Sequence, residues 1–280
     1  MAFEKIKTVS RIVVPRTVRN WLRSPTKSTQ WLWDDVQFKV GITKTLHLPN
    51  GRKLLCHPRA YRSAYRAQLC DPEQGDEFRD FLSRCHEGML LFDVGANFGI
   101  FSLAAADVGG RAIAIEPSSI GVKMISAQAK LNDFTESVRV VTAAAGEAEG
   151  SLRMLSSGVF SDGYLSVVDG HHERETTVVE VTTLDVLVAK FGVPSHLKID
   201  VEGYEEAVLR GGKRLLSESS PLIFLELHNE MVTASRGDPN FCLDELERLG
   251  YRIFTSNGYP IPKREALATP ISRVLACRNL

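Results

Sequence analysis

Four ionisable residues follow two apolar segments in the second half of the chain. Asp200 and Glu202 follow one segment, and Glu226 and His228 follow the other. Packing alone rarely places so many charged groups at the ends of apolar strands. Carboxylates and histidine are the usual acids and bases of proton transfer. The pattern therefore predicts a catalytic site at which a reacting group gives up a proton.

Each of these residues has a chemical and a structural interpretation. His228 is the best general base by its intrinsic pKa, and Asp200 is the best by its position. Glu202 precedes Gly203 and could instead stabilise the first turn of a helix. Lys198 and Asp200 could form a purely structural ion pair. The carboxylates could also bind a hard cation, but the sequence shows no metal-ligand spacing, so we expect no metal.

Earlier in the chain, an apolar segment runs into a turn that contains glycines. Asp93 is followed there by Gly95, Asn97, Phe98 and Gly99. The glycines allow the backbone to approach a ligand closely. Asn97 replaces a middle glycine, and asparagine tolerates the left-handed backbone conformation. Because ligands of open α/β sheets bind at such strand-to-helix crossovers, we predict that these five residues bind a cofactor.

The charge of Asp93 indicates which cofactor this turn accepts. A pyrophosphate would be repelled, since like charges ~4 Å apart at an effective dielectric near 20 repel by about 4 kcal/mol. S-adenosylmethionine (SAM) has no phosphate and carries an ammonium and a sulfonium group. Glu116 ends the next apolar segment and is placed to accept the ribose hydroxyls. The residues therefore favour SAM, although a structural turn with a surface glutamate is the alternative.

These residues need a sheet that brings their strands together. From residue 89 onward, apolar strands alternate with helical segments, which is typical of a mostly parallel sheet. We expect an antiparallel pair to close the sheet at one edge. The carboxyl ends of the parallel strands would then hold the cofactor and the catalytic residues. Expected strands span residues 89–94, 111–116, 138–143, 196–200, 222–227, 251–254 and 272–277, and two further β-rich pieces span residues 151–155 and 177–182. Expected helices span residues 77–85, 98–106, 119–131, 184–191 and 243–249, and another helix follows residue 200 and ends at Gly211-Gly212.

Residues 1–70 form a basic extension before the domain at residues 71–280. The extension holds 14 Lys and Arg against three acidic residues, so the net charge is +11 before residue 71 and −11 after it. We expect a helical arm and a β-hairpin that turns at Asn50-Gly51. The arm could pack on the acidic domain, or it could associate with a membrane surface through Lys, Arg and Trp. Nothing in it resembles a nucleic-acid-binding module.

Three motifs resemble the FkbM-type methyltransferases, and the resemblance covers about residues 71–227. It implies the Rossmann-like class I methyltransferase fold with a seven-stranded sheet. It also implies SAM as the cofactor and methylation, typically of an oxygen atom. In such domains the end of the third strand flanks the adenine, and Ala143 and Ala144 occupy that place. The motifs are DVGANFG at residues 93–99, Glu116-Pro117, and LKIDVEGYE at residues 197–205.

The composition narrows the class of protein further. The chain has no apolar run of the ~20 residues that a spanning helix needs. Its five cysteines are scattered without a CxxC motif, which favours reduced thiols in the cytoplasm. We therefore expect a cytoplasmic SAM-dependent O-methyltransferase that acts on a hydroxyl of a small molecule or glycan, with no nucleic-acid partner. The alternatives are a nicotinamide-dependent oxidoreductase and a non-catalytic SAM-binding scaffold.

One long polar segment, residues 156–175, interrupts the second half of the chain. A long loop in a compact domain is often a lid or a specificity element. It contains the pair His171-His172. Adjacent residues rarely bind one ion together, so we expect this pair to be solvated surface.

Overall fold

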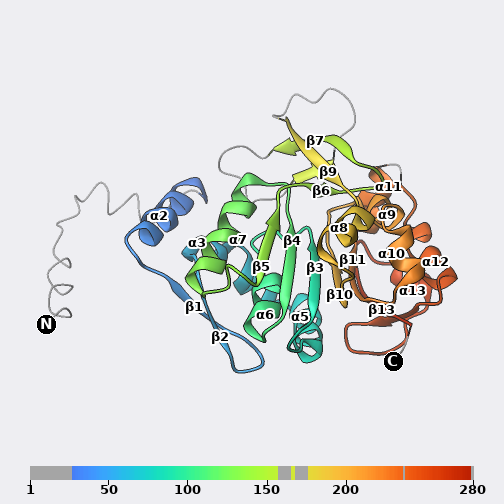
Figure 1. Ribbon diagram of the computed structural model, residues 1–280, viewed down its shortest axis with the longest axis horizontal. Coiled ribbons are helices and arrows are strands. Elements are labelled where there is room, and N and C mark those ends of the chain that lie inside the picture. Colours follow the sequence, from blue (N-terminus) through green and yellow to red (C-terminus); the bar gives the residue numbers. More distant parts are fainter. Residues whose placement is uncertain (1–26, 157–164, 168–175, 236, 279–280) are drawn as a thin grey trace, which may run out of the picture.

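A computed structural model of the protein describes residues 27–156, 165–167, 176–235 and 237–278. Its central feature is a seven-stranded sheet with helices on both faces (Figure 1). The strands are β3 (Leu90–Val94), β4 (Arg111–Ile115), β5 (Val138–Val141), β10 (His196–Ile199), β11 (Leu222–Leu227), β12 (Arg252–Thr255) and β13 (Ser272–Cys277). They lie in the order β12-β13-β11-β10-β3-β4-β5.

The pairing of these strands confirms the predicted sheet. The five strands from β5 to β11 are parallel, and β13 is antiparallel to both β11 and β12. The carboxyl ends of the parallel strands therefore meet at one edge, as a class I methyltransferase fold requires. The antiparallel edge was expected from the two last apolar segments of the chain.

Helices cover both faces because neighbouring residues of each strand point to opposite sides. Leu91 and Phe92 of β3 illustrate this, since each is buried in a different apolar cluster. The helices after the N-terminal extension are α5 (Pro72–Arg84), α6 (Ile100–Asp107), α7 (Ser119–Leu131), α8 (Leu184–Phe191), α9 (Glu205–Arg210), α10 (Lys213–Glu218), α11 (Asn229–Ala234), α12 (Pro239–Arg248) and α13 (Lys263–Ala266).

The glycine pair after α9 differs from its expected role. The sequence suggests that Gly211-Gly212 ends the helix, but a second helix, α10, follows at once. Gly211 has φ −77°, so it does not form a left-handed cap. A Cβ on Gly211 would lie 1.9 Å from the carbonyl oxygen of Gly146. This glycine is therefore required by close backbone packing, and the chain turns there without leaving helical structure.

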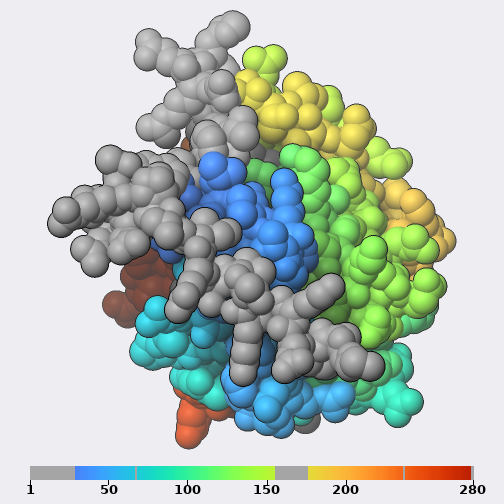
Figure 2. Space-filling model, turned by 90° about the vertical axis from the view of Figure 1, so that its left-hand side faces the viewer, coloured from blue at the N-terminus to red at the C-terminus, as the bar shows by residue number. Residues whose placement is uncertain are grey.

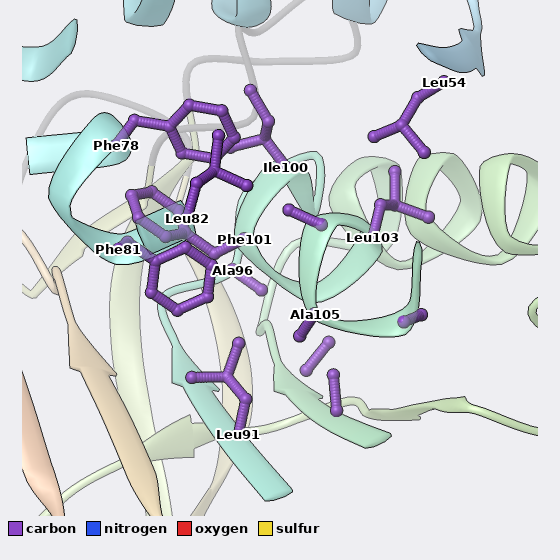
Figure 3. Close-up of a cluster of buried hydrophobic side chains, with 14 of the residues drawn as sticks. Leu54, Phe78, Phe81, Leu82, Leu91, Ala96, Ile100, Phe101, Leu103 and Ala105 are labelled. Carbon is purple, nitrogen blue, oxygen red and sulfur yellow. The ribbon is translucent and has the colours of Figure 1, made fainter. Parts of the chain in front are cut away.

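Aromatic side chains pack α5 onto the sheet (Figure 3). The ring of Phe101 on α6 makes edge contacts with Phe78 at 5.2 Å and with Phe81 at 4.9 Å, both on α5. Leu54 and Leu91 are buried in the same cluster. Helix α5 is thus fixed against α6, the helix that follows the glycine-containing turn.

The described part of the N-terminal extension shares this core. Leu46, Leu54 and Tyr65 are buried within the cluster that covers one face of the sheet. The predicted hairpin is present, with Gly51 at φ +83° in its turn. The helical arm was expected over residues 1–40; its second half is helical from Lys27 to Lys39, and residues 1–26 lie outside the described part of the chain. The elements of the extension are α2 (Lys27–Lys39), β1 (Lys44–His47), β2 (Lys53–Cys56), α3 (Pro58–Ala60), the π-helical turn η2 (Tyr61–Tyr65) and α4 (Arg66–Cys70).

A second, four-stranded sheet lies beside the main one (Figure 1). Its strands are β6 (Ala144–Ala145), β7 (Gly150–Ser156), β8 (Leu165–Val167) and β9 (Thr176–Thr182), in the order β6-β9-β7-β8. The sequence indicated β7 and β9 but not that they form a separate sheet. The pair His171-His172 and most of the predicted lid fall in the stretches that the structure leaves undescribed. None of the described helices is long and apolar enough to span a membrane.

Candidate active site

The turn after β3 packs directly against the segment after β10. Gly95 has φ +80°, and a Cβ on it would lie 1.8 Å from the carbonyl oxygen of Asp200. Only glycine fits such an approach. Asn97 adopts φ +50°, as expected from its tolerance of left-handed backbone. The glycine-containing turn therefore touches the segment that carries Asp200.

Asp93 is buried and bonded to the helix that follows the turn. Its carboxylate accepts hydrogen bonds from the backbone N–H of Ser102 at 3.0 Å and from the Ser102 hydroxyl at 2.6 Å. Burial raises the pKa of Asp93 to about 6, although the bonds from Ser102 oppose that rise. Its carboxylate therefore anchors α6. Its predicted attraction for a cationic ligand stays a prediction.

Glu116 follows β4 and faces the same turn. Its carboxylate accepts the backbone N–H groups of Asn97 and Ser118, each at 2.7 Å. Burial raises the pKa of Glu116 to about 8, against the lowering effect of these two donors. The side chain thus links the ends of β3 and β4.

Two cavities open at the carboxyl ends of the strands. The first lies between the glycine-containing turn, Glu116 and the residues that follow β5. Its walls are mostly apolar, apart from Glu116 and a few polar groups. Its lining residues are Gly95, Asn97, Ile115, Glu116, Pro117, Ala143, Ala144, Ala145, Met154, Asp200, Val201, Glu202 and Tyr204.

The second cavity adjoins the first and is more polar. The two share Gly95, Asn97, Asp200 and Glu202. Asp93, Phe98, Gly99, Glu226 and His228 line the second cavity only, together with Lys198 and Arg273. All twelve residues predicted for cofactor binding or catalysis thus line one or both cavities.

A cluster of carboxylates surrounds His228 in the second cavity. The imidazole is 3% exposed, and its Nδ1 donates to Glu205 Oε1 at 2.8 Å. Three further carboxylates face Nε2 at distances longer than a hydrogen bond. They are Glu202 at 3.5 Å, Glu226 at 3.8 Å and Asp200 at 3.9 Å.

The neighbouring charges and burial in this cluster shift the pKa values of His228 and Asp200. Burial alone would lower the pKa of His228, but the bond to Glu205 and the carboxylates of Asp200 and Glu202 raise it to about 9. His228 therefore holds its proton more tightly than a free imidazole does, and its proposed role as general base stays a prediction. Burial and the neighbouring Glu226 raise the pKa of Asp200 well above its usual value, despite Lys198 and His228. Asp200 thus binds its proton more readily than an ordinary aspartate.

Lys198 is buried among acidic side chains. Its Nζ donates to Glu77 Oε1 at 2.7 Å and lies 3.7 Å from Glu226 Oε2. Arg273 also pairs with Glu226, at 2.5 Å. The suggested ion pair of Lys198 with Asp200 is therefore replaced by contacts with Glu77 and Glu226. These cations neutralise part of the negative charge in the cluster.

The structural role suggested for Glu202, stabilising the first turn of a helix, belongs to another residue. Glu202 has φ +53° and lies before α9, whereas Glu205 opens that helix. The backbone N–H of Gly203 donates to Glu205 Oε1 at 3.2 Å. An acid does stabilise this helix start, but it is Glu205. Glu202 faces His228 instead.

Three residues of the cluster have ligand atoms close enough to share a metal ion. One atom each from Asp200, Glu226 and His228 lies within 4.8 Å of the other two. Glu226 is already paired with Arg273. The predicted absence of a metal is therefore not tested by this geometry and stays a prediction.

Sequence reasoning missed the residues that the N-terminal extension places in the second cavity. Tyr65 of η2 donates to the carbonyl oxygen of Phe98, and Gln128 Nε2 of α7 donates to both Tyr65 Oη (2.6 Å) and that carbonyl (2.9 Å). No local motif marks these residues, because their role depends on contacts distant in sequence. The missed lining residues of the extension and α5 are Ser63, Ala64, Tyr65, Gln68 and Gln74.

Comparison with known families assigns the region that holds these motifs to a family. A family model described as the methyltransferase FkbM domain matches residues 93–253, more than half of the chain. The chain belongs to the FkbM methyltransferase family. This confirms the resemblance drawn from the three motifs. The matched FkbM region contains all twelve predicted site residues, whereas Tyr65, Gln74 and Arg273 lie outside it.

Two solved structures of methyltransferases are similar to this chain at low sequence identity. An FkbM methyltransferase from Methylobacillus flagellatus KT is 19% identical, with a TM-score of 0.47 over 78% of this chain and 53% of that one. The chain thus spans about half the length of that protein. An O-methyltransferase from Bacillus cereus, in complex with SAH, is 12% identical, with a TM-score of 0.44 over 88% and 96% of the two chains. No curated protein matches.

Proposed function

We propose that this FkbM-family protein transfers a methyl group from SAM to a hydroxyl oxygen on a small molecule or glycan. The observation that carries the proposal is the junction of the two cavities at Asp200 and Glu202. A cofactor in one cavity and an acceptor in the other would meet beside two carboxylates. Such an arrangement suits a reaction that needs both alignment and removal of a proton.

The first cavity fits the nucleoside part of SAM. Ala143, Ala144 and Met154 give it apolar walls, and Glu116 gives it one carboxylate for hydroxyl groups. Asn97 Oδ1 is buried without a hydrogen-bond partner among the described residues, so it is free to accept from a ligand. When bound, SAM would supply a methyl group activated by its sulfonium. The acidic residues at the junction suit that positive charge.

Asp200 is the residue that we assign to proton removal. It lines both cavities, and its raised pKa suits it to receive a proton at its carboxylate. His228 carries a proton at neutral pH, so it lacks the free nitrogen that a base needs. Its positive charge stabilises the ionised form of Asp200, and Glu205 holds the imidazole in place. His228 and Glu205 are therefore positioning residues.

The second cavity supports a polar acceptor. Ser63, Gln68 and Gln74 offer neutral hydrogen-bonding groups, and the acidic cluster lines the same cavity. Neutral amides and hydroxyls pair well with the hydroxyl groups of a sugar or another small polar molecule. The excess of carboxylates over free cations disfavours a phosphate backbone, which supports the expectation of no nucleic-acid partner.

Replacing Asp200 by asparagine tests the assignment. We expect Asp200→Asn to lower kcat by about 10²–10⁴-fold, because a general base contributes that much. The measurement is methyl transfer from labelled SAM into acceptor extracts, with the product identified by mass. Glu230→Gln, at an exposed position, is the control. Turnover by Asp200→Asn at the wild-type rate would remove Asp200 from the mechanism.

Calorimetric titration separates the proposed function from its rivals. We expect wild-type protein to bind SAM and its demethylated product but not NAD. Binding of NAD alone would instead indicate an oxidoreductase. Binding of SAM with no methylated product from any extract would indicate a SAM-binding scaffold.

A further inference from the structure

Helix α2 exposes an apolar face that no described part of the protein covers. Leu32 is 55% exposed, Trp33 45% and Val36 41%. Val40 (69%) and Ile42 (46%) continue the apolar surface just beyond the helix. At 100° per residue, positions 32, 33, 36 and 40 fall within an arc of about 100°. We call these five side chains the outer face of α2.

Contacts on the opposite side of α2 fix the helix with its outer face exposed. Trp31 is buried, and Phe38 lies 4.3 Å from the ring of His57. Asp34 is fully buried and forms an ion pair with Arg62. Because this side packs on residues 57–62, rotation of the helix to hide its outer face would break a buried ion pair. The exposure is therefore a property of the packed helix.

The exposed large hydrophobic residues of the described chain are concentrated in the outer face. Five of the ten large hydrophobic residues that are exposed in the described chain fall within residues 32–42. The other five are Leu55, Val178, Val193, Tyr259 and Ile271. Scattered single exposures are ordinary, but a contiguous patch marks an interaction surface.

The charge of the sequence on either side of this patch indicates its partner. Residues 1–27 contain seven Lys and Arg but one acidic residue, Glu4. Lys39 lies between residues of the patch in the sequence, and Lys44 follows it. A basic flank beside Trp and aliphatic side chains suits an anionic lipid surface, where the side chains enter at headgroup depth. Each basic residue near such a surface raises binding by about fivefold. A neutral protein groove would gain nothing from this charge.

We propose that the outer face of α2 docks the protein on an anionic membrane surface. The blue atoms of residues 27–39 reach the surface on the side shown in Figure 2. Arg62, which holds α2 through Asp34, is followed by Ser63 in the wall of the second cavity. Docking would therefore bring that wall close to the lipid headgroups. This inference does not depend on the proposed chemistry.

Vesicle flotation tests the proposal with full-length protein. We expect wild-type protein to float with vesicles of phosphatidylcholine and phosphatidylglycerol, and to bind vesicles of phosphatidylcholine alone at least about tenfold more weakly. Added salt should weaken the binding, since it screens the basic residues. The triple variant Leu32→Ser, Val36→Ser, Val40→Ser should lose at least about tenfold in binding.

A matched variant removes three exposed apolar side chains elsewhere. Val178→Ser, Val193→Ser, Tyr259→Ser should bind vesicles like the wild type. Equal binding by the α2 triple variant, or no binding of wild-type protein to anionic vesicles, would overturn the proposal. So would a change from dimer to monomer in the α2 variant without any vesicle binding, because the face would then join two copies. Titration of the α2 triple variant with SAM shows, independently of vesicle binding, whether the variant is folded and keeps its cofactor site.

Discussion

At the scale of single residues, the buried carboxylate of Glu205 sets the charge of His228. It lies 2.8 Å from Nδ1, and the other carboxylates face Nε2. An imidazolium in this setting is stabilised by several negative charges at once. Asp200 gains in turn a nearby cation that favours its ionised form. In the proposed mechanism the pair would separate the two roles, with Asp200 as the base and His228 as its charged neighbour.

The raised pKa of His228 predicts a pH-dependent stability. Its pKa is about 9 in the folded protein and near 6.5 when unfolded, so the folded state binds the proton more tightly. This stabilisation is complete below pH 6.5 and is lost as pH rises through 9. It amounts to on the order of 3 kcal/mol. Denaturant unfolding from pH 6 to 10 should show a steeper loss of free energy in wild type than in His228→Gln. Parallel curves would contradict the assignment.

The sequence sufficed to find these residues but not their protonation. Asp200 and His228 follow apolar strands and Glu226 lies near the end of one. Because parallel strands end at a common edge, the meeting of these residues could be predicted. The pKa of His228 depends on Glu205, whose position on the first turn of α9 fixes its distance from the imidazole. Intrinsic pKa values carry no information about such a contact.

At the scale of elements, one hydrogen-bonded group ties three segments together. Tyr65 of η2, Gln128 of α7 and the carbonyl of Phe98 bond one another in the core. Phe98 belongs to the turn whose neighbours Asn97 and Gly99 line the second cavity. The extension therefore helps to hold the turn that we assign to the cofactor.

Removing the Tyr65 hydroxyl tests this connection. Tyr65→Phe keeps the buried ring but removes one hydrogen bond to Phe98 and one from Gln128. We expect the unfolding free energy to fall by about 1–2 kcal/mol and SAM affinity to fall by up to about tenfold as the turn loosens. Denaturant unfolding and calorimetry measure the two effects. Tyr259→Phe, at a 72% exposed position, should change neither. Unchanged affinity in Tyr65→Phe would show that the turn holds its shape alone.

Elements with clear periodicity were predictable, and those set by tertiary contacts were not. Helix α8 has the bounds expected from its pattern, with Thr183 as its N-cap. Helix α10 was missed because Gly211 looks like a helix stop. Position 211 is instead glycine because the backbone of Gly146 approaches it too closely for a Cβ. The small sheet was missed for a similar reason, since strand pairing is non-local and leaves little local signal.

At the scale of the whole molecule, the hairpin of the extension and the main sheet share one apolar core. Leu46 and Leu54 pack in the same cluster as Leu91 and Leu103. The boundary at residue 70, drawn from composition and charge, is thus crossed by buried contacts. Charge patterning reflects the composition of the surface, whereas the extent of a folding unit is set by the buried core that its residues share.

A shared core predicts a single unfolding transition. Leu54 is 1% exposed, so Leu54→Ala should lower the free energy of global unfolding by about 2–5 kcal/mol. Leu55→Ala, at a 40% exposed neighbour on the same strand, should have little effect. Calorimetry should show one transition that moves to lower temperature in Leu54→Ala. A separate early transition would mean that the hairpin unfolds independently.

The second cavity is lined partly by the matched family region and partly by residues that precede it, and this has a consequence for evolution. Its catalytic side lies inside the matched family region, while Ser63, Gln68 and Gln74 lie before it. If the second cavity binds the acceptor as we propose, substitutions in that upstream stretch would alter acceptor preference and leave the methyl-transfer groups untouched. Duplicated genes of this kind can therefore diversify their substrates by exchanging a short stretch of chain, without repeating the invention of the chemistry.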